Sequence, residues 1–265
     1  MKNKIVTSIK KLFYLSKNNS IKWSGYFEIY EELFRPFKNK NITFVEIGVK
    51  NGGSLEIWKK YFGKQSRIIG IDINPKCQIF EKDGYEIFIG NQSSPEFWNS
   101  FFKKVGKVDI ILDDGGHTNI DQITTTINTV SKIKNNGLLV IEDIHTSYSK
   151  EYNSSIKYSF INYTKKLIDE INLNSNSFFR KHVYSINFFE KIVAFKINRL
   201  KCKFNVSIQN GKKNHNIEDL TWTANELNIN HINNFFSYIP FISLRKIKRF
   251  IKNRVNTSKI KKYFY

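Results

Sequence analysis

The chain has 265 residues, with 43 lysines and arginines against 23 aspartates and glutamates, a formal net charge of +20. That length fits one large α/β domain with additions at its ends. Apolar residues make up 40% of the chain and aromatic residues 15%, enough for a hydrophobic core, which excludes a wholly disordered protein. Only 4 prolines and 13 glycines exclude a fibrous or linker-like protein.

The positive charge is concentrated at the two ends of the chain. Residues 1–22 contain six lysines and residues 241–265 contain nine lysines and arginines, and neither segment has an acidic residue. Residues 23–240 hold 28 basic and 23 acidic residues, a charge of only +5. The charge therefore favours attachment or assembly through the tails, including peripheral contact with an anionic membrane, over nucleic-acid binding by the central part.

Other features of the sequence indicate the compartment. Two cysteines, Cys77 and Cys202, are too few for a disulfide framework or a zinc site. No apolar run approaches the ~18 residues that cross a bilayer, and Lys10 and Lys11 interrupt the apolar stretch near the start, so we expect no signal peptide. A cytoplasmic protein is expected, with the inner face of the membrane as a further location if the tails bind lipid.

In chain order, the first expected element is a helix over residues 12–36, with Tyr26, Ile29, Tyr30 and Leu33 on one stripe. Short β-rich runs then alternate with stretches that have apolar residues at helical spacing. The expected strands are 42–49, 67–73, 86–90, 108–113 and 137–143, and the expected helices between them are 54–62, 94–105 and 118–133. Because the strand runs are continuously apolar, we expect a mostly parallel sheet with helices on both faces, a Rossmann-like doubly wound α/β fold.

The remaining elements are a helix over 155–171 and two strands, 183–189 and 191–197, whose tight connection predicts an antiparallel hairpin at the sheet edge. Beyond Pro240, apolar residues from Leu244 to Val255 form a stripe on a strongly basic segment. This pattern predicts a helix that faces the core or a partner, and a helix lying on a membrane surface is the alternative.

The first expected strand ends in Glu46-Ile47-Gly48 and continues through Gly52-Gly53-Ser54 into a helix. A glycine-rich turn at this point lets the backbone approach a ligand at the carboxyl ends of the strands. The spacing Glu-x-Gly-x-x-x-Gly differs from the dinucleotide-binding pattern. It is similar to the first motif of class I S-adenosylmethionine methyltransferases, in which the carboxylate (Glu46) lies near the methionine ammonium and the glycines admit the amino-acid part. A tight turn without a ligand is the alternative interpretation.

The next two expected strands end in further candidate cofactor-binding residues. Asp72, 24 residues after Gly48, can accept two hydrogen bonds from ribose hydroxyls, although a helix cap is the alternative role. Asn91 and Gln92 follow the third strand, where methyltransferases place groups that meet the adenine edge. Asp113, at the end of the fourth strand, is a candidate for supporting the same site or for capping a helix.

Acidic residues follow both the fourth and the fifth expected strand, as Asp113-Asp114-Gly115-Gly116-His117 and Glu142-Asp143-Ile144-His145. Neighbouring strands lie about 4.8 Å apart, so Asp114, Glu142 and Asp143 are predicted to share a small volume, where they repel each other unless a cation relieves them. Ligation by oxygen atoms alone suits a hard divalent ion, Mg²⁺ first, with Mn²⁺ or Ca²⁺ as alternatives. Such an ion lowers the pKa of a coordinated hydroxyl, and His117 is placed to remove the proton as general base. The alternative is that Asp113 and Asp143 cap helices and His117 is an ordinary loop residue.

At this level of detail the sequence resembles a known family. The segments FVEIGVKNGGSLEIWKKYFG, RIIGIDINPKC, IGNQSSPEFW, IILDDGGH, GLLVIEDIHTSY and HVYSINFFEKIVAFK, in this order, resemble the macrocin O-methyltransferase family, which includes mycinamicin sugar methyltransferases. KWSGYFEIYEELF resembles the leading helix of that family, and the match covers roughly residues 22–198. Asn91 departs from it, since many relatives carry aspartate there.

The resemblance implies a class I methyltransferase fold, S-adenosylmethionine as cofactor, a sugar hydroxyl as acceptor and a homo-oligomer. It also implies a divalent metal at Asp114, Glu142 and Asp143 and a histidine base at His117. His145 and Tyr148, just beyond the metal motif, are candidate residues on the acceptor side; the alternatives are that Tyr148 only packs the loop and that His145 orients Asp143. The expected organisation is an N-terminal helical segment (1–40), an S-adenosylmethionine-binding catalytic domain (41–200) and a basic C-terminal extension (201–265).

The leading hypothesis is therefore a metal-dependent O-methyltransferase that acts on a sugar hydroxyl, with a nucleotide-activated sugar for a bacterial surface polysaccharide as the expected acceptor. An RNA methyltransferase, motivated by the basic tails, is the second hypothesis. A non-catalytic module that binds polyanions or membranes is the third. The intact candidate cofactor and metal residues argue against the third, because a binding module has no need of all of them.

Overall fold

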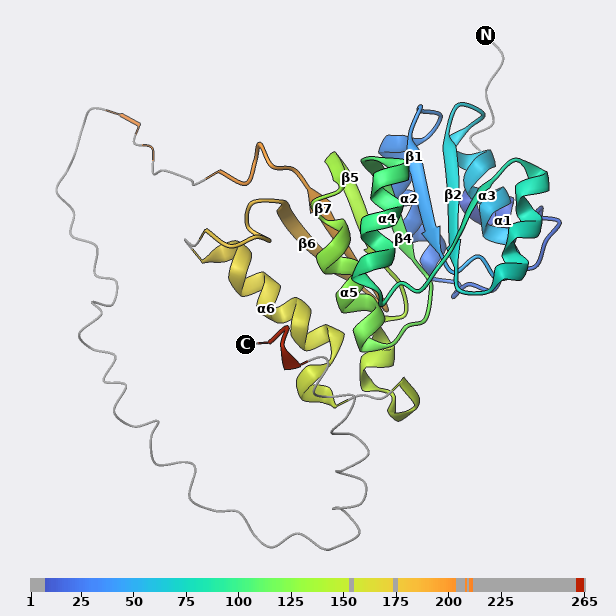
Figure 1. Cartoon of the computed structure of the whole chain (residues 1–265). Helices are drawn as coiled ribbons and strands as arrows, with labels where there is room; N and C mark the ends of the chain where they lie inside the picture. Colours follow the sequence, from blue (N-terminus) through green and yellow to red (C-terminus); the bar gives the residue numbers. More distant parts are fainter. Residues whose placement is uncertain are drawn as a thin grey trace, which may run out of the picture.

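The computed structural model describes residues 8–152, 155–173, 176–203, 208, 210–211 and 261–264. Its centre is a seven-stranded sheet in the order β3-β2-β1-β4-β5-β7-β6 (Figure 1). The strands are β1 (Thr43–Ile47), β2 (Arg67–Asp72), β3 (Glu86–Ile89), β4 (Val108–Asp113), β5 (Ile133–Ile141), β6 (Val183–Phe189) and β7 (Ile192–Ile197). The first five run parallel, and β7 pairs antiparallel with both β5 and β6. The doubly wound sheet and its antiparallel edge hairpin are thus confirmed.

Helices cover both faces of the sheet (Figure 1). One face packs against α1 (Ile9–Tyr14), α2 (Tyr26–Phe34) and α3 (Gly53–Phe62), and the other against α4 (Pro95–Val105), α5 (Asn119–Thr129) and α6 (Phe160–Asn172). Successive residues of a strand point to opposite faces: Phe44 and Ile110 join the first apolar cluster, and Val45 and Ile111 join the second. Burial on both faces explains why the strand sequences are apolar without interruption.

The strand order reverses between β1 and β4. In open α/β sheets, ligands bind at the carboxyl ends of the strands on either side of such a point. Asp114 donates its backbone N–H to the carbonyl of Ile47 at 3.0 Å, which brings the loops after these two strands together. Gly48 has a φ of +93°, and a Cβ atom there would lie 2.1 Å from the carbonyl oxygen of Asp114. Only glycine fits this close approach.

The helix predicted over residues 12–36 is wrong as a single element. In the structure α1 ends at Tyr14 and α2 begins at Tyr26, and residues 15–25, the α1–α2 loop, are not helical. This stretch has a polar run over 16–20 that offers no apolar face to the core. Its polar groups bind α3 instead: Ser16 Oγ donates to the carbonyl of Gly53 at 3.1 Å, and the Lys17 N–H donates to Glu56 at 2.9 Å. Tertiary contacts therefore override the helical pattern.

The other expected helices are present with small changes at their ends. α5 ends at Thr129, before residue 133, because Ile133 already starts β5. α6 begins at Phe160, after the short 3₁₀ turn Ile156–Tyr158. Further 3₁₀ turns are Arg35–Phe37, Pro75–Asp83, Ile144–Tyr148 and Lys150–Tyr152.

The C-terminal part of the chain is described only in pieces. The amphipathic helix predicted between Leu244 and Val255 lies outside the described residues. Within residues 261–264, the ring of Phe264 packs edge-on against Tyr158 and Tyr163, with centroids 5.4 and 5.8 Å apart. Among the described helices, none has the length and apolar character needed to cross a bilayer.

Candidate active site

A cavity of about 500 Å³ opens at the carboxyl ends of the parallel strands, a size typical of small-molecule sites. Of the predicted cofactor-binding residues, its wall includes Gly48, Ser54, Asp72, Asn91 and Gln92. Residues 19–22 of the α1–α2 loop also line it, together with Asp114, His117 and Asp143. Glu46, Gly52 and Asp113 do not line the cavity, so any role they have there is indirect.

Glu46 is fully buried behind the cavity wall. Its carboxylate accepts hydrogen bonds from Ser54 Oγ at 2.7 Å and from Trp58 Nε1 at 3.1 Å. Burial raises the pKa of Glu46 to about 7, against the hydrogen bonds and the Lys22 charge that lower it. Glu46 thus fixes the first turns of α3, which carry Ser54 into the cavity.

Asp72 holds the glycine-rich loop in place. Its Oδ2 accepts from the backbone N–H groups of Val49 and Lys50 at 2.9 and 3.0 Å, and its Oδ1 accepts from that of Asn74 at 2.8 Å. Lys50 has a φ of 48°, a conformation that costs free energy for a residue with a side chain. The carboxylate of Asp72 therefore shapes the loop after β1 and still contributes to the cavity wall.

The side chain of Gln92 is occupied by protein partners. Its Nε2 lies 3.0 Å from both carboxylate oxygens of the buried Asp113, and its Oε1 accepts from the Gly116 N–H at 2.9 Å. Asp113 also accepts from the Gly115 N–H at 3.1 Å, and burial raises its pKa to about 6. Gln92 and Asp113 together orient the loop after β4, and this leaves Asn91 as the better placed of the two amides for a ligand.

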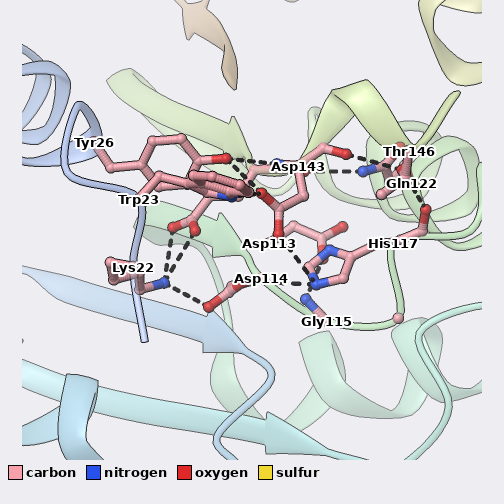
Figure 2. A network of polar contacts seen from close by, with 12 residues as sticks. Lys22, Trp23, Tyr26, Asp113, Asp114, Gly115, His117, Gln122, Asp143 and Thr146 are labelled. Atoms are coloured by element: carbon pink, nitrogen blue, oxygen red, sulfur yellow. Dashed lines mark hydrogen bonds and ion pairs between the residues drawn. The ribbon is translucent and has the colours of Figure 1, made fainter. Parts of the chain in front are cut away.

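The ends of β4 and β5 bring Asp114, His117 and Asp143 together (Figure 2). His117 Nε2 lies 3.7 Å from Asp114 Oδ1 and 3.6 Å from Asp143 Oδ2. One donor atom from each of the three residues lies within 4.8 Å of the others, and all three side chains are partly exposed to the cavity. The predicted convergence of the two strand ends is therefore present for these residues.

His117 and Asp143 both have left-handed backbones, with φ values of 56° and 54°. Residues with side chains adopt this region at a cost, and such strain clusters at functional sites. Thr146 Oγ1 lies 2.8 Å from the His117 carbonyl and 2.9 Å from the Asp143 carbonyl, and Gln122 Nε2 donates to the Glu142 carbonyl at 3.0 Å (Figure 2). These contacts hold the two strained residues beside each other.

The α1–α2 loop and α2 supply residues that the sequence motifs did not reveal (Figure 2). Lys22 Nζ donates to Asp114 Oδ2 at 2.5 Å. Trp23 Nε1 and the Tyr26 hydroxyl donate to Asp143 Oδ1 at 3.2 and 2.5 Å. Each aspartate thus has one oxygen bound by the N-terminal segment and its other oxygen directed toward His117. The only signal in the sequence was the resemblance of the KWSGY segment to the family's leading helix.

Glu142 lies behind Lys22 and away from the cavity wall. Its carboxylate is 1% exposed and accepts from Lys22 Nζ at 3.0 and 3.1 Å and from the Tyr30 hydroxyl. Burial raises the pKa of Glu142, as does the nearby Asp114. Burial alone would lower the pKa of Lys22, but the carboxylates of Asp114 and Glu142 raise it well above its usual value. Lys22 therefore stays an ammonium ion between the two carboxylates.

An aromatic rim borders the metal-binding candidates. Trp23 is half exposed, and its ring lies 5.9 Å from that of His145 in an edge-on arrangement. His145 Nδ1 is buried without a hydrogen-bond partner, 3.8 Å from Asp143 Oδ1. The predicted acceptor-side residue Tyr148 is 62% exposed. Lys191 Nζ lies 3.3 Å from the Trp23 ring centroid, a cation–π contact that fixes the indole.

The chain is similar to several known methyltransferases over part of its length. No family model matches the chain. The 8-demethyl-8-alpha-L-rhamnosyl tetracenomycin-C 2'-O-methyltransferase of Streptomyces olivaceus is 31% identical over 166 residues, 58% of this chain and 43% of that protein. Mycinamicin VI 2''-O-methyltransferase of Micromonospora griseorubida is 33% identical over 126 residues, 45% of this chain and 31% of that protein. Demethylmacrocin O-methyltransferase of Streptomyces fradiae is 32% identical over 127 residues, again 45% and 31%.

The chain thus spans less than half the length of these curated relatives. Among solved structures, a methyltransferase of the mycinamycin biosynthetic pathway, in complex with Mg, SAH and Mycinamycin VI, has a TM-score of 0.65 at 24% identity. The alignment covers 73% of this chain and 54% of that one. The fold is that of the class I methyltransferases, and the resemblance to sugar O-methyltransferases of the macrocin type is confirmed over the shared segment.

Proposed function

We propose that the protein is an S-adenosylmethionine-dependent O-methyltransferase that methylates a sugar hydroxyl with the help of a divalent cation, Mg²⁺ or Mn²⁺. The observation that carries the proposal is the convergence of Asp114, His117 and Asp143 on one side of the cavity at the β1–β4 reversal. The curated relatives are named as O-methyltransferases, one of them for a rhamnosyl tetracenomycin, and they support the same chemistry.

The cavity suits the cofactor at three points. Gly48 lets the backbone approach the amino-acid part. Asp72 ends β2 with carboxylate oxygens that can accept further hydrogen bonds from ribose hydroxyls. Asn91 lines the far part of the wall, where an adenine edge would lie. When bound, the cofactor supplies a methyl group made electrophilic by a sulfonium.

The donor set fits a hard divalent cation. Asp114 Oδ1 and Asp143 Oδ2 face the cavity with His117 Nε2, and His145 Nδ1 is a buried polar atom without a hydrogen-bond partner beside Asp143. Asp114 and Asp143 would hold the ion, and Glu142 would add its charge from behind Lys22. A bound ion would supply Lewis acidity that lowers the pKa of the acceptor hydroxyl.

His117 would act as the base. Its Nε2 would take the proton of the acceptor hydroxyl as the oxygen bonds to the methyl carbon and the carbon–sulfur bond breaks. The carboxylates at 3.6 and 3.7 Å would stabilise the imidazolium that forms. The strained loops that carry His117 and Asp143 orient these groups before the reaction, so little reorganisation is needed during it.

The acceptor would lie at the aromatic rim. Trp23 and His145 border Asp143 and offer ring faces and polar edges for a sugar, and the exposed Tyr148 ends the turn that follows Asp143. The relatives are named for glycosides such as rhamnosyl tetracenomycin. A nucleotide-activated sugar for a surface polysaccharide, a homo-oligomer and tail contact with an anionic membrane stay predictions.

The test is an acceptor screen. The protein is incubated with S-adenosylmethionine, Mg²⁺ and a panel of nucleotide-activated hexoses and deoxyhexoses, free rhamnosides and RNA oligonucleotides, and methylated products are found by mass spectrometry. A methylated sugar that disappears with chelator and returns with Mg²⁺ is expected. Full turnover in chelator, or unchanged turnover in Asp114→Ala, would contradict the metal site, and methylated RNA would replace the sugar hypothesis.

A further inference from the structure

Lys191 places a cation at the aromatic rim of the candidate site. Its Nζ lies 3.3 Å from the ring centroid of Trp23, over the face of the indole. The indole Nε1 donates to Asp143 Oδ1 at 3.2 Å, so a single ring connects the ammonium with a carboxylate of the cavity wall. Lys191 and Trp23 do not line the cavity themselves. The ammonium therefore belongs to the rim, where the acceptor is proposed to lie.

The backbone of Lys191 is fixed against the candidate site. Lys191 lies in the turn between β6 and β7 and has a left-handed φ of 63°, a conformation that costs free energy for a residue with a side chain. Its carbonyl accepts from the N–H of Ile144, the residue after Asp143, at 3.1 Å. Strained residues that their surroundings hold in place are frequent at functional sites. The tip of the hairpin thus presents the lysine from a defined position.

The ammonium of Lys191 has N–H donors that its protein contacts do not use. A lysine ammonium carries three such donors, and within the described part of the chain Nζ donates no hydrogen bond to another residue. Its ion-pair partner there is Glu190, whose Oε1 lies 3.8 Å away on a largely exposed side chain, so the pair is weak. The Lys191 side chain is itself partly exposed. A ligand at the rim can therefore reach it.

We propose that Lys191 is a specificity-determining residue that binds an anionic group of the acceptor, either the phosphate of a nucleotide-activated sugar or the carboxylate of an acidic sugar. The inference rests on the proposed sugar methylation and narrows its substrate class to sugars that carry a negative charge. The sugar ring would pack against the half-exposed Trp23, and its anionic group would accept a charge-assisted hydrogen bond from Nζ.

This role differs from that of a lysine that only fixes the indole. The cation–π contact orients Trp23 for every acceptor, so its loss would weaken the binding of neutral and anionic sugars by the same factor. Loss of an ionic contact weakens the binding of those sugars alone that carry the anion. Salt also screens an ionic contact at a partly exposed site. The preference for an anionic over a neutral sugar therefore separates the two roles.

The experiment compares two matched pairs of sugars on the full chain. One pair is nucleoside-diphosphate rhamnose and methyl rhamnoside, which tests a phosphate, and the other is methyl glucuronide and methyl glucoside, which tests a carboxylate. Calorimetry in the presence of S-adenosylhomocysteine and Mg²⁺ measures the dissociation constant of each sugar. Mass spectrometry with S-adenosylmethionine in its place follows methylation and separates KM from kcat for the preferred sugar.

The unmodified protein is expected to bind the anionic member of one pair more tightly than its neutral counterpart. Lys191→Met should lower this preference about tenfold or more and raise the KM of the anionic sugar with little change in kcat, because a hydrogen bond to a charged group is lost. Lys191→Arg keeps the charge and should retain most of the preference. High salt should reduce the preference of the unmodified protein and leave that of Lys191→Met unchanged.

The matched control is Lys201→Met. Lys201 Nζ lies 5.0 Å from the ring centroid of the exposed Tyr184, a contact of the same kind, but Lys201 follows the end of β7 opposite to Lys191. Its removal should leave every preference unchanged. Thermal unfolding checks that each variant folds, and Lys191→Gln gives a second reading if Lys191→Met does not.

Two results overturn the proposal. The first is an equal loss of affinity for the anionic and the neutral member in folded Lys191→Met. The second is an unmodified protein that binds the neutral member of both pairs as tightly as the anionic one. If no sugar of either pair binds or is methylated, the proposed function itself fails, which is a distinguishable result.

Discussion

In both Asp114 and Asp143, the two oxygens of the carboxylate have different partners. One oxygen of each is bound by the N-terminal segment, through Lys22, Trp23 and Tyr26, and the other faces His117. A carboxylate fixed at one oxygen keeps the other in a defined place, which is how supporting contacts increase the precision of a site.

The role of His117 can be separated from that of a metal ligand. We expect His117→Ala to lower turnover by about 10²-fold or more, the usual contribution of a general base, while Mn²⁺ affinity changes only a few-fold. Turnover is followed with S-adenosylmethionine at saturating Mg²⁺, and Mn²⁺ binding by calorimetry. Loss of Mn²⁺ binding in His117→Ala would instead place the imidazole among the metal ligands.

Glu46 should give the protein a measurable pH dependence. Its pKa is about 7 in the folded state because of burial and ordinary when unfolded, so between about pH 4.5 and 7 the folded state holds a proton that the unfolded state has released. Stability from this group is therefore present at low pH and lost as the pH rises toward 7. The unmodified protein loses this stability as the pH rises, and Glu46→Gln does not. The free energy of unfolding of Glu46→Gln minus that of the unmodified protein should therefore increase by ~3 kcal/mol between pH 4.5 and pH 8.

Denaturant unfolding of both proteins across this range, in chelator so that metal binding does not contribute, measures the difference. Other titrating groups such as Asp113 are common to both proteins and cancel. A difference between the two proteins that stays constant with pH would show that Glu46 has an ordinary pKa.

The residues found from sequence and those missed differ in how local their signals are. Asp114, His117 and Asp143 follow strands within short motifs, so the parallel-sheet rule was enough to bring them together. Lys22 meets Asp114 across 92 positions and Glu142 across 120, and nothing in a local pattern encodes that contact. The prediction that Glu142 joins the other two carboxylates around a metal omitted the buried lysine that lies beside it, and the metal ligands themselves stay a prediction.

At the level of elements, the α1–α2 loop supplies side chains that bind the candidate site residues Asp114 and Asp143. The helical pattern failed over residues 15–25 because polar side chains there bind α3 and the strand ends. The parallel strands, in contrast, were predicted well, since continuous apolar runs bounded by turns have few other stable arrangements. Chain ends and connections are decided by tertiary contacts, which a single-sequence pattern does not carry.

Trp23 on this loop gives a test of the acceptor rim. With the sugar identified in the screen, Trp23→Leu should raise the KM for the acceptor about five- to tenfold, roughly 1 kcal/mol, because it removes the exposed ring that Lys191 fixes. Trp23→Phe keeps a ring but loses the indole N–H to Asp143, so it should retain most of the acceptor affinity. Calorimetry with S-adenosylhomocysteine serves as the control and should give the same affinity for all three proteins. An equal loss of acceptor affinity in both variants would mean that the N–H contact, and not the ring, matters.

In the whole molecule, the acidic residues of the cavity and most of the net positive charge lie in different parts of the chain. The described domain converges acidic residues on its cavity, while most of the net positive charge lies in terminal segments, largely outside the described residues. The cavity proposed to bind the cofactor lies in this domain, so we expect cofactor binding to raise the stability of the domain without any acceptor.

We expect S-adenosylhomocysteine at 100 times its dissociation constant to stabilise the folded protein by about 2.7 kcal/mol. For a domain of this size that corresponds to a rise of about 5–10 °C in the unfolding midpoint. Differential scanning fluorimetry over a range of ligand concentrations measures it, with adenosine alone as the comparison. No shift at any concentration would remove the cofactor from the proposal.

The contacts between the α1–α2 loop and the strand ends join residues that the ribosome synthesises far apart in time. Lys22, Trp23 and Tyr26 leave the ribosome early, but their partners Asp114 and Asp143 follow some 92 to 120 residues later. Contacts between residues so distant in sequence are slow to form, because the chain loses conformational entropy before the contacts compensate for that loss. Because Asp143 follows β5, a nascent chain that stops before β5 cannot complete the contacts of Trp23 and Tyr26 with the candidate site.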